Sequence, residues 1–407
     1  MDLTSVVKLV PDIAQREALS HTMRLANSCC DWMSEIAWES QAFRKYDLHH
    51  KTYHRGRKTF GLGAQVVIRA VAKVADAYKT AFRLHRDRVR RIKRRNQKLV
   101  ASGKQPTPIP VMERCRFGET GAVAYDDRIL AWKIDRRTVS IWTVAGRLHV
   151  RFQAGEHQLA MLQHRSGESD LVFRHGEFYL AATCDVPVVV AENSATEFLG
   201  VDLGVANIAT DSDGNRHSGS QVKSVRFRHR RLRSRLQSKQ TRGAKRRLKR
   251  LSGKESRFAR HINHCVSKEI VAQAQGSGRG IKLEDLSEIR DRITVRRKQR
   301  VVLHGWAFYQ LRRFIAYKAV LAGVPVVLVD PANTSRECAE CGYIDKRNRP
   351  NQSTFRCLGC GHTGHADVNA ARVISGRAAR KPAEGSNTAR LSNMCSSTHV
   401  LVKSHRL

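Results

Sequence analysis

The sequence lacks any apolar run near the ~20 residues that a membrane-spanning helix requires, and its acidic residues are scarce. Only 36 Asp and Glu stand against 74 Lys and Arg, so the formal net charge is +38 and the isoelectric point is about 10.7. The first absence argues against a membrane-spanning protein. The second predicts a polyanionic partner, for which nucleic acid is the first expectation and an anionic membrane surface the alternative.

Cysteine is sparse as well and does not suggest a disulfide framework. Ten cysteines occur in 407 residues; four lie in a paired pattern and six are scattered. This usage is typical of a reducing compartment. The N-terminus reads as a mixed, strand-like segment and not as a signal peptide, so we expect a cytoplasmic, nucleoid-associated protein with no membrane partner.

The length and the hydrophobic content of 41% predict two to four globular domains. Residues 1–10 are typical of a strand, and Asp12 with Gln15 three residues later predicts a capped helix start. Helical spacing dominates residues 11–105. Three prolines then mark a linker, and short strands follow within residues 106–195. We expect a helical domain and a small antiparallel barrel or sandwich, to which residues 1–10 add a strand.

Two segments are strongly basic. Ten of the 22 residues from Arg83 to Lys104 are Lys or Arg, as are 17 of the 40 residues from Gln221 to Arg260. A solvated face is the alternative for the first and disorder for the second. Unbroken like charge, however, destabilises a helix until a phosphate backbone supplies counter-charge, and apolar residues keep helical spacing through the second segment. We therefore expect a helical hairpin over residues 221–275 and nucleic-acid-binding arginines in both segments. These arginines are Arg90, Arg91, Arg94, Arg95, Arg230, Arg231, Arg246, Arg247 and Arg250.

Four cysteines form two C-x2-C pairs that are separated by 15 residues. They are Cys338, Cys341, Cys357 and Cys360. This spacing is typical of structural zinc, and four thiolates leave no open coordination position for catalysis. Gly342 and Gly361 follow the two pairs, where the backbone must turn sharply around the metal. His362 and His365 are alternative ligands, although the four sulfurs suffice.

Three acidic residues interrupt otherwise apolar segments that lie far apart in the sequence. Asp202 ends a predicted strand before a Gly204 turn, Glu284 ends another, and Asp367 opens a predicted helix. A single buried carboxylate is more often structural, and it is costly unless something neutralises it. Together, three carboxylates can hold two magnesium ions that activate water and stabilise the leaving oxygen in phosphodiester cleavage. The combination predicts a metal-dependent nuclease.

The order of these elements, acid, acid, four-cysteine ribbon, acid, resembles the TnpB family of insertion-sequence proteins, which are related to miniature type V CRISPR effector nucleases. The resemblance covers about residues 198–375. It is carried by Gly200-Val201-Asp202-Leu203-Gly204, by Leu283-Glu284-Asp285-Leu286, by the cysteine ribbon that opens at Thr334-Ser335-Arg336-Glu337-Cys338, and by His365-Ala366-Asp367-Val368-Asn369-Ala370-Ala371.

The resemblance implies an α/β fold plus a β-barrel and helical lobes. An RNase H-like RuvC nuclease domain would span residues 196–335 and 366–376, with a zinc ribbon inserted at 336–365. Residues 1–10 and 106–195 would form a wedge barrel and residues 11–105 a recognition domain. Residues 377–407 would be a disordered tail.

The resemblance also implies RNA-guided cleavage of double-stranded DNA beside a short flanking motif. Asp202, Glu284 and Asp367 would be the catalytic acids that hold Mg²⁺, and Zn²⁺ would be structural. Guide RNA and target DNA would be the partners, bound by a monomer or by a homodimer on one RNA. The alternatives are an RNA-guided DNA-binding regulator that does not cut, a CRISPR-associated miniature type V effector, and a transposase accessory protein without guide RNA.

Three further expectations concern two single residues and one segment. Asp285 is expected to face solvent, with support of Glu284 as the alternative. Asn369 either orients Asp367 or caps the helix. The apolar run at residues 324–330 predicts a strand that is buried on both faces.

Overall fold

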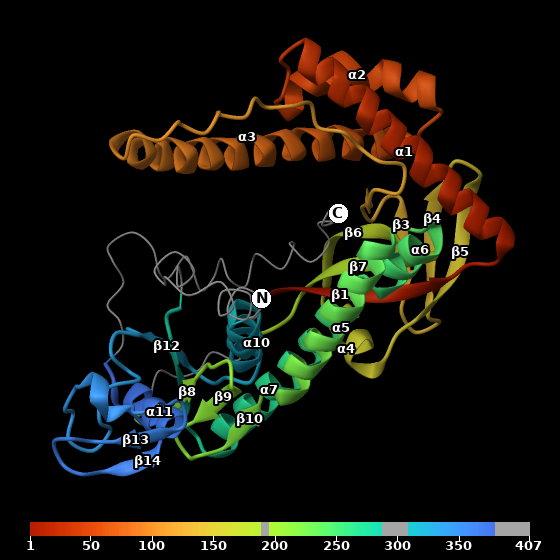
Figure 1. The fold of residues 1–407 in the computed structure, drawn as a ribbon. Coiled ribbons are helices and arrows are strands. Elements are labelled where there is room, and N and C mark those ends of the chain that lie inside the picture. Colours follow the sequence, from red (N-terminus) through yellow and green to blue (C-terminus); the bar gives the residue numbers. More distant parts are fainter. Residues whose placement is uncertain (189–194, 287–307, 379–407) are drawn as a thin grey trace. The chain divides into compact units, whose positions relative to one another are not determined.

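The computed structural model describes residues 1–188, 195–286 and 308–378, and the chain divides into two compact units (Figure 1). Within the described residues, one unit is Met1–Val186 and the other begins at Pro187. The predicted tail from residue 379 onward lies outside the described residues. No helix in the described ranges is both long enough and apolar enough to cross a membrane.

The first unit contains a seven-stranded antiparallel sheet in the order β2-β6-β7-β1-β5-β4-β3. The strands are β1 (Asp2–Val10), β2 (Val123–Tyr125), β3 (Leu130–Lys133), β4 (Thr138–Thr143), β5 (Gly146–Gln153), β6 (Arg165–Arg174) and β7 (Glu177–Asp185). The N-terminal strand is thus the central one. The Trp132 indole N–H on β3 donates a hydrogen bond to the Ser169 hydroxyl on β6 over 3.3 Å, which brings the two ends of the sheet together. The expected barrel, with a strand from residues 1–10, is confirmed.

Helices precede and interrupt these strands. They are α1 (Ile13–Glu39), α2 (Lys45–Phe60), α3 (Ala64–Ala101) and α4 (Glu156–Leu162). Asp12 and Gln15 form the predicted capping box at the start of α1. Leu19, Met23 and Met33 on α1 join residues of the barrel in one apolar core. Whether the helices and the barrel are separate domains stays a prediction.

The second unit is built on a five-stranded mixed sheet in the order β10-β9-β8-β11-β12. The strands are β8 (Phe198–Asp202), β9 (Asn207–Asp211), β10 (Arg216–Ser218), β11 (Gly280–Glu284) and β12 (Val326–Val329). The first three pair antiparallel, whereas β11 pairs parallel to both β8 and β12. The expectation of a doubly buried strand at 324–330 is wrong, because β12 is an edge strand of this sheet and three of its four residues are only half-buried.

Helices cover both faces of this sheet. They are α5 (Ser220–Lys239), α6 (Arg242–Leu251), α7 (Lys254–Gly276), α10 (Phe308–Leu321) and α11 (Ala366–Gly376). Apolar residues of α7 and α10 share a core with Leu199, Val201 and Ile281, whereas α11 packs on the opposite side, against Gly200. The expected hairpin over residues 221–275 is wrong in detail. The segment forms three helices, because the backbone adopts left-handed conformations at Gln240 and Gly253 and breaks the helix twice.

The close approach of Gly200 to α11 generates a stability prediction. A Cβ at this position would overlap the Ala371 carbonyl oxygen and would lie 2.5 Å from the Ser375 amide nitrogen, and both are backbone atoms that cannot rotate away. We expect Gly200→Ala to lower the free energy of unfolding by roughly 1–3 kcal/mol, measured by urea denaturation. Gly243→Ala on α6, where a Cβ meets nothing within 4 Å, is the control and should be neutral or stabilising. Equal stability of the two variants would contradict the packing argument.

Candidate functional site

The register of β8 and β11 brings two of the predicted acids together. Lys282 lies beside Gly200 and Leu283 beside Val201, so the same register continued by one residue sets Glu284 beside Asp202. Side chains alternate along a strand. Lys282 faces α11, because its ammonium donates to the Ser375 carbonyl oxygen over 2.8 Å. Glu284, two residues on, therefore shares that face, as Asp202 shares the face of Gly200.

The third acid reaches the same place from α11. Asp367 lies in the first turn of this helix, and its amide donates to Nδ1 of His365, the N-cap residue, over 3.2 Å. Because the parallel strands end at Asp202 and Glu284 where α11 begins, the three carboxylates gather at one end of the sheet. The hairpin between β8 and β9 turns tightly at Gly204, where a Cβ would lie 2.8 Å from the Asn207 carbonyl oxygen.

The cluster is electrostatically unfavourable without a counter-ion. Burial, together with the negative charges of Glu284 and Asp367, raises the pKa of Asp202 to about 8. Glu284 is 7% exposed, and its burial likewise raises its pKa. Such a set of hard carboxylate oxygens fits a divalent cation such as Mg²⁺. Its charge would offset both the cost of burying the carboxylates and the repulsion among them.

Side chains that the sequence did not single out hold these acids. The Asn207 amide donates to Asp367 Oδ2 over 2.9 Å, and the Arg349 guanidinium donates to Asp367 Oδ1 over 2.8 Å. The Arg349 charge also opposes the rise in the pKa of Asp202. The Thr334 hydroxyl donates to Glu284 Oε1. Thr334 is the first residue of the quoted ribbon motif, so the sequence marked its segment but not its role. Nothing in the sequence around Arg349 indicates that it lies beside Asp367.

Arg377 adds a second positive charge on the Glu284 side. Its guanidinium pairs with Glu337 and donates to the Asp330 carbonyl oxygen over 2.6 Å. Its charge lowers the pKa of Glu284 against the effect of burial. Arg377, which the sequence assigned to the disordered tail, is therefore tied to the folded unit. The folded segment thus extends past its expected end at residue 376, because Arg377 bonds to Asp330 and Glu337.

Asp285 does not face solvent. It is 9% exposed, and its Oδ1 accepts a hydrogen bond of 2.9 Å from Arg312 on α10, which is 7% exposed. The expectation of a solvent-facing carboxylate is wrong, because the charged group of α10 reaches the end of β11 and neutralises it. The pair fixes the backbone that follows Glu284.

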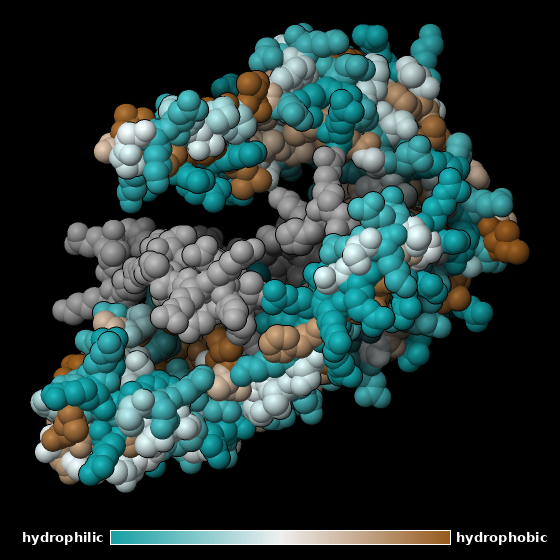
Figure 2. Space-filling model, in the orientation of Figure 1, coloured by the Kyte–Doolittle hydropathy of each residue, from teal (hydrophilic) through white to brown (hydrophobic). Residues whose placement is uncertain are grey.

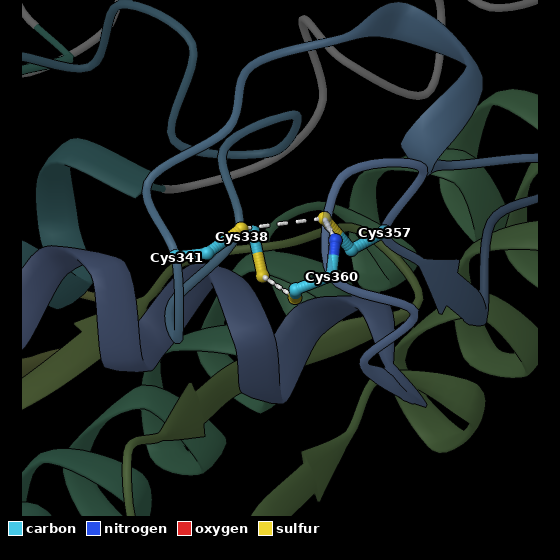
Figure 3. A group of neighbouring side chains, drawn as sticks. All are labelled: Cys338, Cys341, Cys357 and Cys360. Carbon is cyan, nitrogen blue, oxygen red and sulfur yellow. Dashed lines mark hydrogen bonds between the residues drawn. The ribbon is translucent and has the colours of Figure 1, made fainter.

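The four cysteines converge in a second site (Figure 3). All four sulfurs lie within 4.8 Å of one another, with 3.7 Å between Cys338 and Cys360 and 3.5 Å between Cys341 and Cys357. Tetrahedral zinc with Zn–S bonds of ~2.3 Å requires sulfurs about 3.8 Å apart, whereas a disulfide requires ~2.05 Å. Gly342 and Gly361 adopt the expected left-handed backbone, with φ of 73° and 76°. The arrangement fits a four-thiolate zinc ion.

The two histidines do not join this cluster. His365 caps α11, and the His362 carbonyl oxygen accepts from the Cys357 amide. In the described residues, the cysteine set is the one group of three or more His, Cys, Asp or Glu side chains whose ligand atoms all lie within 4.8 Å. The three carboxylates therefore stand farther apart than the ligands of a single compact ion site.

Two asparagines join the ribbon to helix α11 and to itself. The ribbon contains the short strands β13 (Thr354–Arg356) and β14 (Thr363–His365). The Asn348 side chain donates to the Arg336 and Tyr343 carbonyls and accepts from the Leu358 amide, so it connects both cysteine pairs. Asn369 accepts from the Ala339 amide and donates to the Glu337 carbonyl. Neither role expected for Asn369 applies: it anchors α11 to the start of the ribbon.

The nine predicted nucleic-acid-binding arginines are all exposed on helices α3, α5 and α6. Within the parts of the chain that the structure describes, none of them forms an ion pair with an acid. The acid Glu255 pairs instead with Arg226 and Arg233, which join α5 to the start of α7. Hydrophilic residues cover much of the visible surface of α3 (Figure 2). The role of the nine arginines stays a prediction.

The cysteine geometry predicts a metal content. The purified chain should contain about one zinc per molecule, and Cys357→Ser should lose it, because a tetrahedral thiolate shell that lacks one ligand binds zinc far more weakly. Elemental analysis by mass spectrometry measures this, with Cys265→Ser as the control, since that cysteine is exposed on α7. Retention of zinc by the Cys357 variant would contradict the assignment.

The Asp285–Arg312 pair predicts a large effect of removing one partner. Asp285→Asn removes the charge that neutralises buried Arg312 and should lower the free energy of unfolding by roughly 3–5 kcal/mol in thermal or urea denaturation. Glu340→Gln is the control, because Glu340 pairs with Arg372 at 3.9 Å with both side chains about half exposed, and it should change stability by less than ~1 kcal/mol. Equal effects would refute the structural role of the buried pair.

Comparisons with known proteins match both halves of the second unit and about half of the chain. Residues 181–287 match the family model described as a probable transposase (OrfB_IS605), and residues 308–374 match the Cas12f1-like TNB domain. The chain is 34% identical over 242 residues to the CRISPR-associated endodeoxyribonuclease Cas12f1 of Sulfoacidibacillus thermotolerans, a match that covers 55% of each chain. It is 31% identical over 218 residues to the putative RNA-guided DNA endonuclease InsQ of Escherichia coli K12, covering 49% of this chain and 53% of that protein.

The match in fold covers more of the chain than the matches in sequence do. A cryo-EM structure of CasPhi-2 (Cas12j) bound to crRNA aligns with 94% of this chain and 99% of that chain, with a TM-score of 0.60 and 10% identity, which shows a shared fold. The chain spans about half the length of the curated relatives it matches. The resemblance to the TnpB family is confirmed: the chain is a relative of the TnpB-like and Cas12f proteins.

Proposed function

We propose that the chain is an RNA-guided DNA endonuclease that cuts double-stranded DNA at a single metal-dependent site. The observation that carries this proposal is the convergence of Asp202, Glu284 and Asp367, from three distant segments, at one end of a mixed sheet. The mixed sheet, with three antiparallel strands followed by two parallel ones, supports an RNase H-like RuvC domain. The names of the curated relatives support the RNA guide and the DNA substrate.

Asp202, Glu284 and Asp367 would hold two magnesium ions. Several carboxylates around two ions are the ligand set that such two-metal sites use. When bound, such ions activate water and stabilise charge on the leaving oxygen. The chain itself orients the ligands: Asn207 and Arg349 fix both oxygens of Asp367, and Thr334 fixes one oxygen of Glu284.

Arg349 would also contact the nucleic-acid substrate. Its guanidinium now compensates the charge of Asp367, which the metal ions would also do. Once ions are bound, the guanidinium is free to face a phosphate oxygen instead, for which its planar donors are well suited. Arg349 belongs to the zinc ribbon, so the zinc would act on catalysis by holding this arginine at the acids.

The nine exposed arginines would hold the guide RNA and its duplex with target DNA through the phosphate backbone. Specificity would then come from base pairing, and the positive charge of the chain would hold the backbones of the paired strands. A regulator that binds without cutting is disfavoured, because such a protein has no use for three gathered acids.

The experiment uses the RNA that co-purifies with the chain. That RNA is sequenced, a plasmid carrying the matching target is built with randomised flanking bases, and cleavage is followed with Mg²⁺ and with EDTA. Asp202→Asn and Asp367→Asn should reduce cleavage by more than the ~10–100-fold typical of outer-shell changes, while target binding persists. Glu340→Gln, an exposed acid on the ribbon, should cut normally. Cutting by Asp202→Asn at the wild-type rate would reject the proposed site.

A further inference from the structure

Helix α2 carries an unbroken series of aromatic rings along one exposed flank. Tyr46 packs against His50 with 4.5 Å between ring centroids, and His49 stacks on Tyr53 at 4.6 Å with an interplanar angle of 20°. His49 and His50 are 6.2 Å apart, and Tyr53 touches His54 at 5.1 Å. Five rings therefore follow one another over little more than two helical turns.

The packing of α2 on α1 determines that this flank faces outward. Leu48, Thr52 and Gly56, spaced four residues apart, are the buried residues of the helix. A Cβ on Gly56 would lie 3.2 Å from the Met33 side chain and 3.4 Å from Trp32, so the two helices meet closely there. With that stripe turned inward, Tyr46, His50 and His54 lie on the outer side of the helix, whereas His49 and Tyr53 are half-buried and Tyr53 packs against the core. Tyr46 is 74% exposed, and His50 and His54 are also exposed.

Positive charge flanks the rings. Lys51 and Lys58 lie on the other exposed flank of α2, and the Arg57 guanidinium lies over the Tyr53 ring, 5.8 Å from its centroid. Asp47 is the one acid of the helix. An exposed aromatic surface beside a row of cations is the combination that binds a single nucleic-acid strand, because bases stack on the rings while the cations contact the phosphates.

We propose that the outer face of α2 binds an unpaired nucleic-acid strand by stacking its bases on Tyr46 and His50. The ligand is a strand whose bases are free, either single-stranded RNA or single-stranded DNA, and not a duplex, whose bases are stacked on one another and unavailable. This inference rests on the proposed nucleic-acid function but concerns a surface far in sequence from the acids and from the nine arginines. A protein partner is disfavoured, because three of the five rings are histidines, cations lie beside them, and they form no continuous apolar patch.

The test measures binding of the full-length chain, freed of co-purified RNA, to a short mixed-sequence RNA, to the same sequence as DNA, and to the duplex of each. Fluorescence anisotropy is recorded over a range of KCl concentrations at about pH 8, where histidine is mostly uncharged. Tyr46→Ala/His50→Ala should weaken binding of single strands by at least about fivefold while leaving the duplex affinities unchanged. The dependence of binding on salt should not change, because the removed groups carry no charge.

Three controls separate stacking from other causes. Tyr46→Phe/His50→Phe keeps the rings and should retain wild-type affinity. Lys51→Gln/Lys58→Gln should instead reduce the salt dependence, by ~0.7 in the log–log slope for each phosphate that the chain no longer neutralises. His21→Ala removes an exposed ring from α1 and should have no effect. A larger loss of affinity for RNA than for DNA assigns the surface to guide RNA, the reverse assigns it to a DNA strand, and equal losses assign it to any unpaired strand.

Several outcomes would overturn the inference. These are unchanged single-strand affinity in the alanine variant, an equal loss of affinity for duplexes, failure of the phenylalanine variant to retain binding, and a change in oligomeric state that would make the rings a protein interface. The result does not depend on cleavage. If the wild-type chain binds strands but never cuts DNA, the proposed nuclease function fails while the α2 surface stands.

Discussion

The close packing of Gly200 against α11 is the constraint on which the second unit depends. Because a strand residue without a side chain lets the backbone of the helix lie against the sheet, the first turn of α11 comes within reach of the ends of β8 and β11. The parallel register of those two strands places the other two acids together, since it sets Glu284 beside Asp202. One backbone contact and one register thus bring together residues that are separated by more than 80 positions each.

The same arrangement creates its own electrostatic problem, which the chain solves only in part. Repulsion and burial raise the pKa of Asp202 to about 8, while the charges of Arg349 and Arg377 oppose these effects at Asp202 and Glu284 respectively. Both arginines come from segments around the zinc ribbon and α11, not from the sheet. The sheet therefore supplies negative charge and the later segments supply the compensation. This division gives the ribbon a part in the site through Arg349, although four thiolates would leave a bound zinc ion no open position for chemistry.

The sequence was informative wherever function requires an unusual residue at a regular position. Isolated acids in apolar strands and paired cysteines are such signals, and a capping box or an alternating N-terminal strand is equally local. It was uninformative where the result depends on which segments meet. Asp285 looked like a solvent-facing neighbour of Glu284, and only the packing of α10 reveals that Arg312 buries it. Arg349 could not be found, since its place follows from the fold of the ribbon. The extra break at Gly253, which divides the expected hairpin into three helices, depends on a single left-handed residue.

Positive charge in this protein serves three physical purposes that composition alone cannot separate. Arg312 and Arg377 are neutralised inside the second unit and contribute to its stability. The nine predicted nucleic-acid-binding arginines of α3, α5 and α6 have no acidic partner among the described residues, so binding a phosphate backbone would relieve the repulsion among them. On α2 the cations accompany aromatic rings, and there the energy of stacking is added to that of charge. A net charge of +38 is therefore not one uniform surface: of these three groups, the second and third are exposed to a polyanion, and in our proposal the third would distinguish unpaired bases from a duplex.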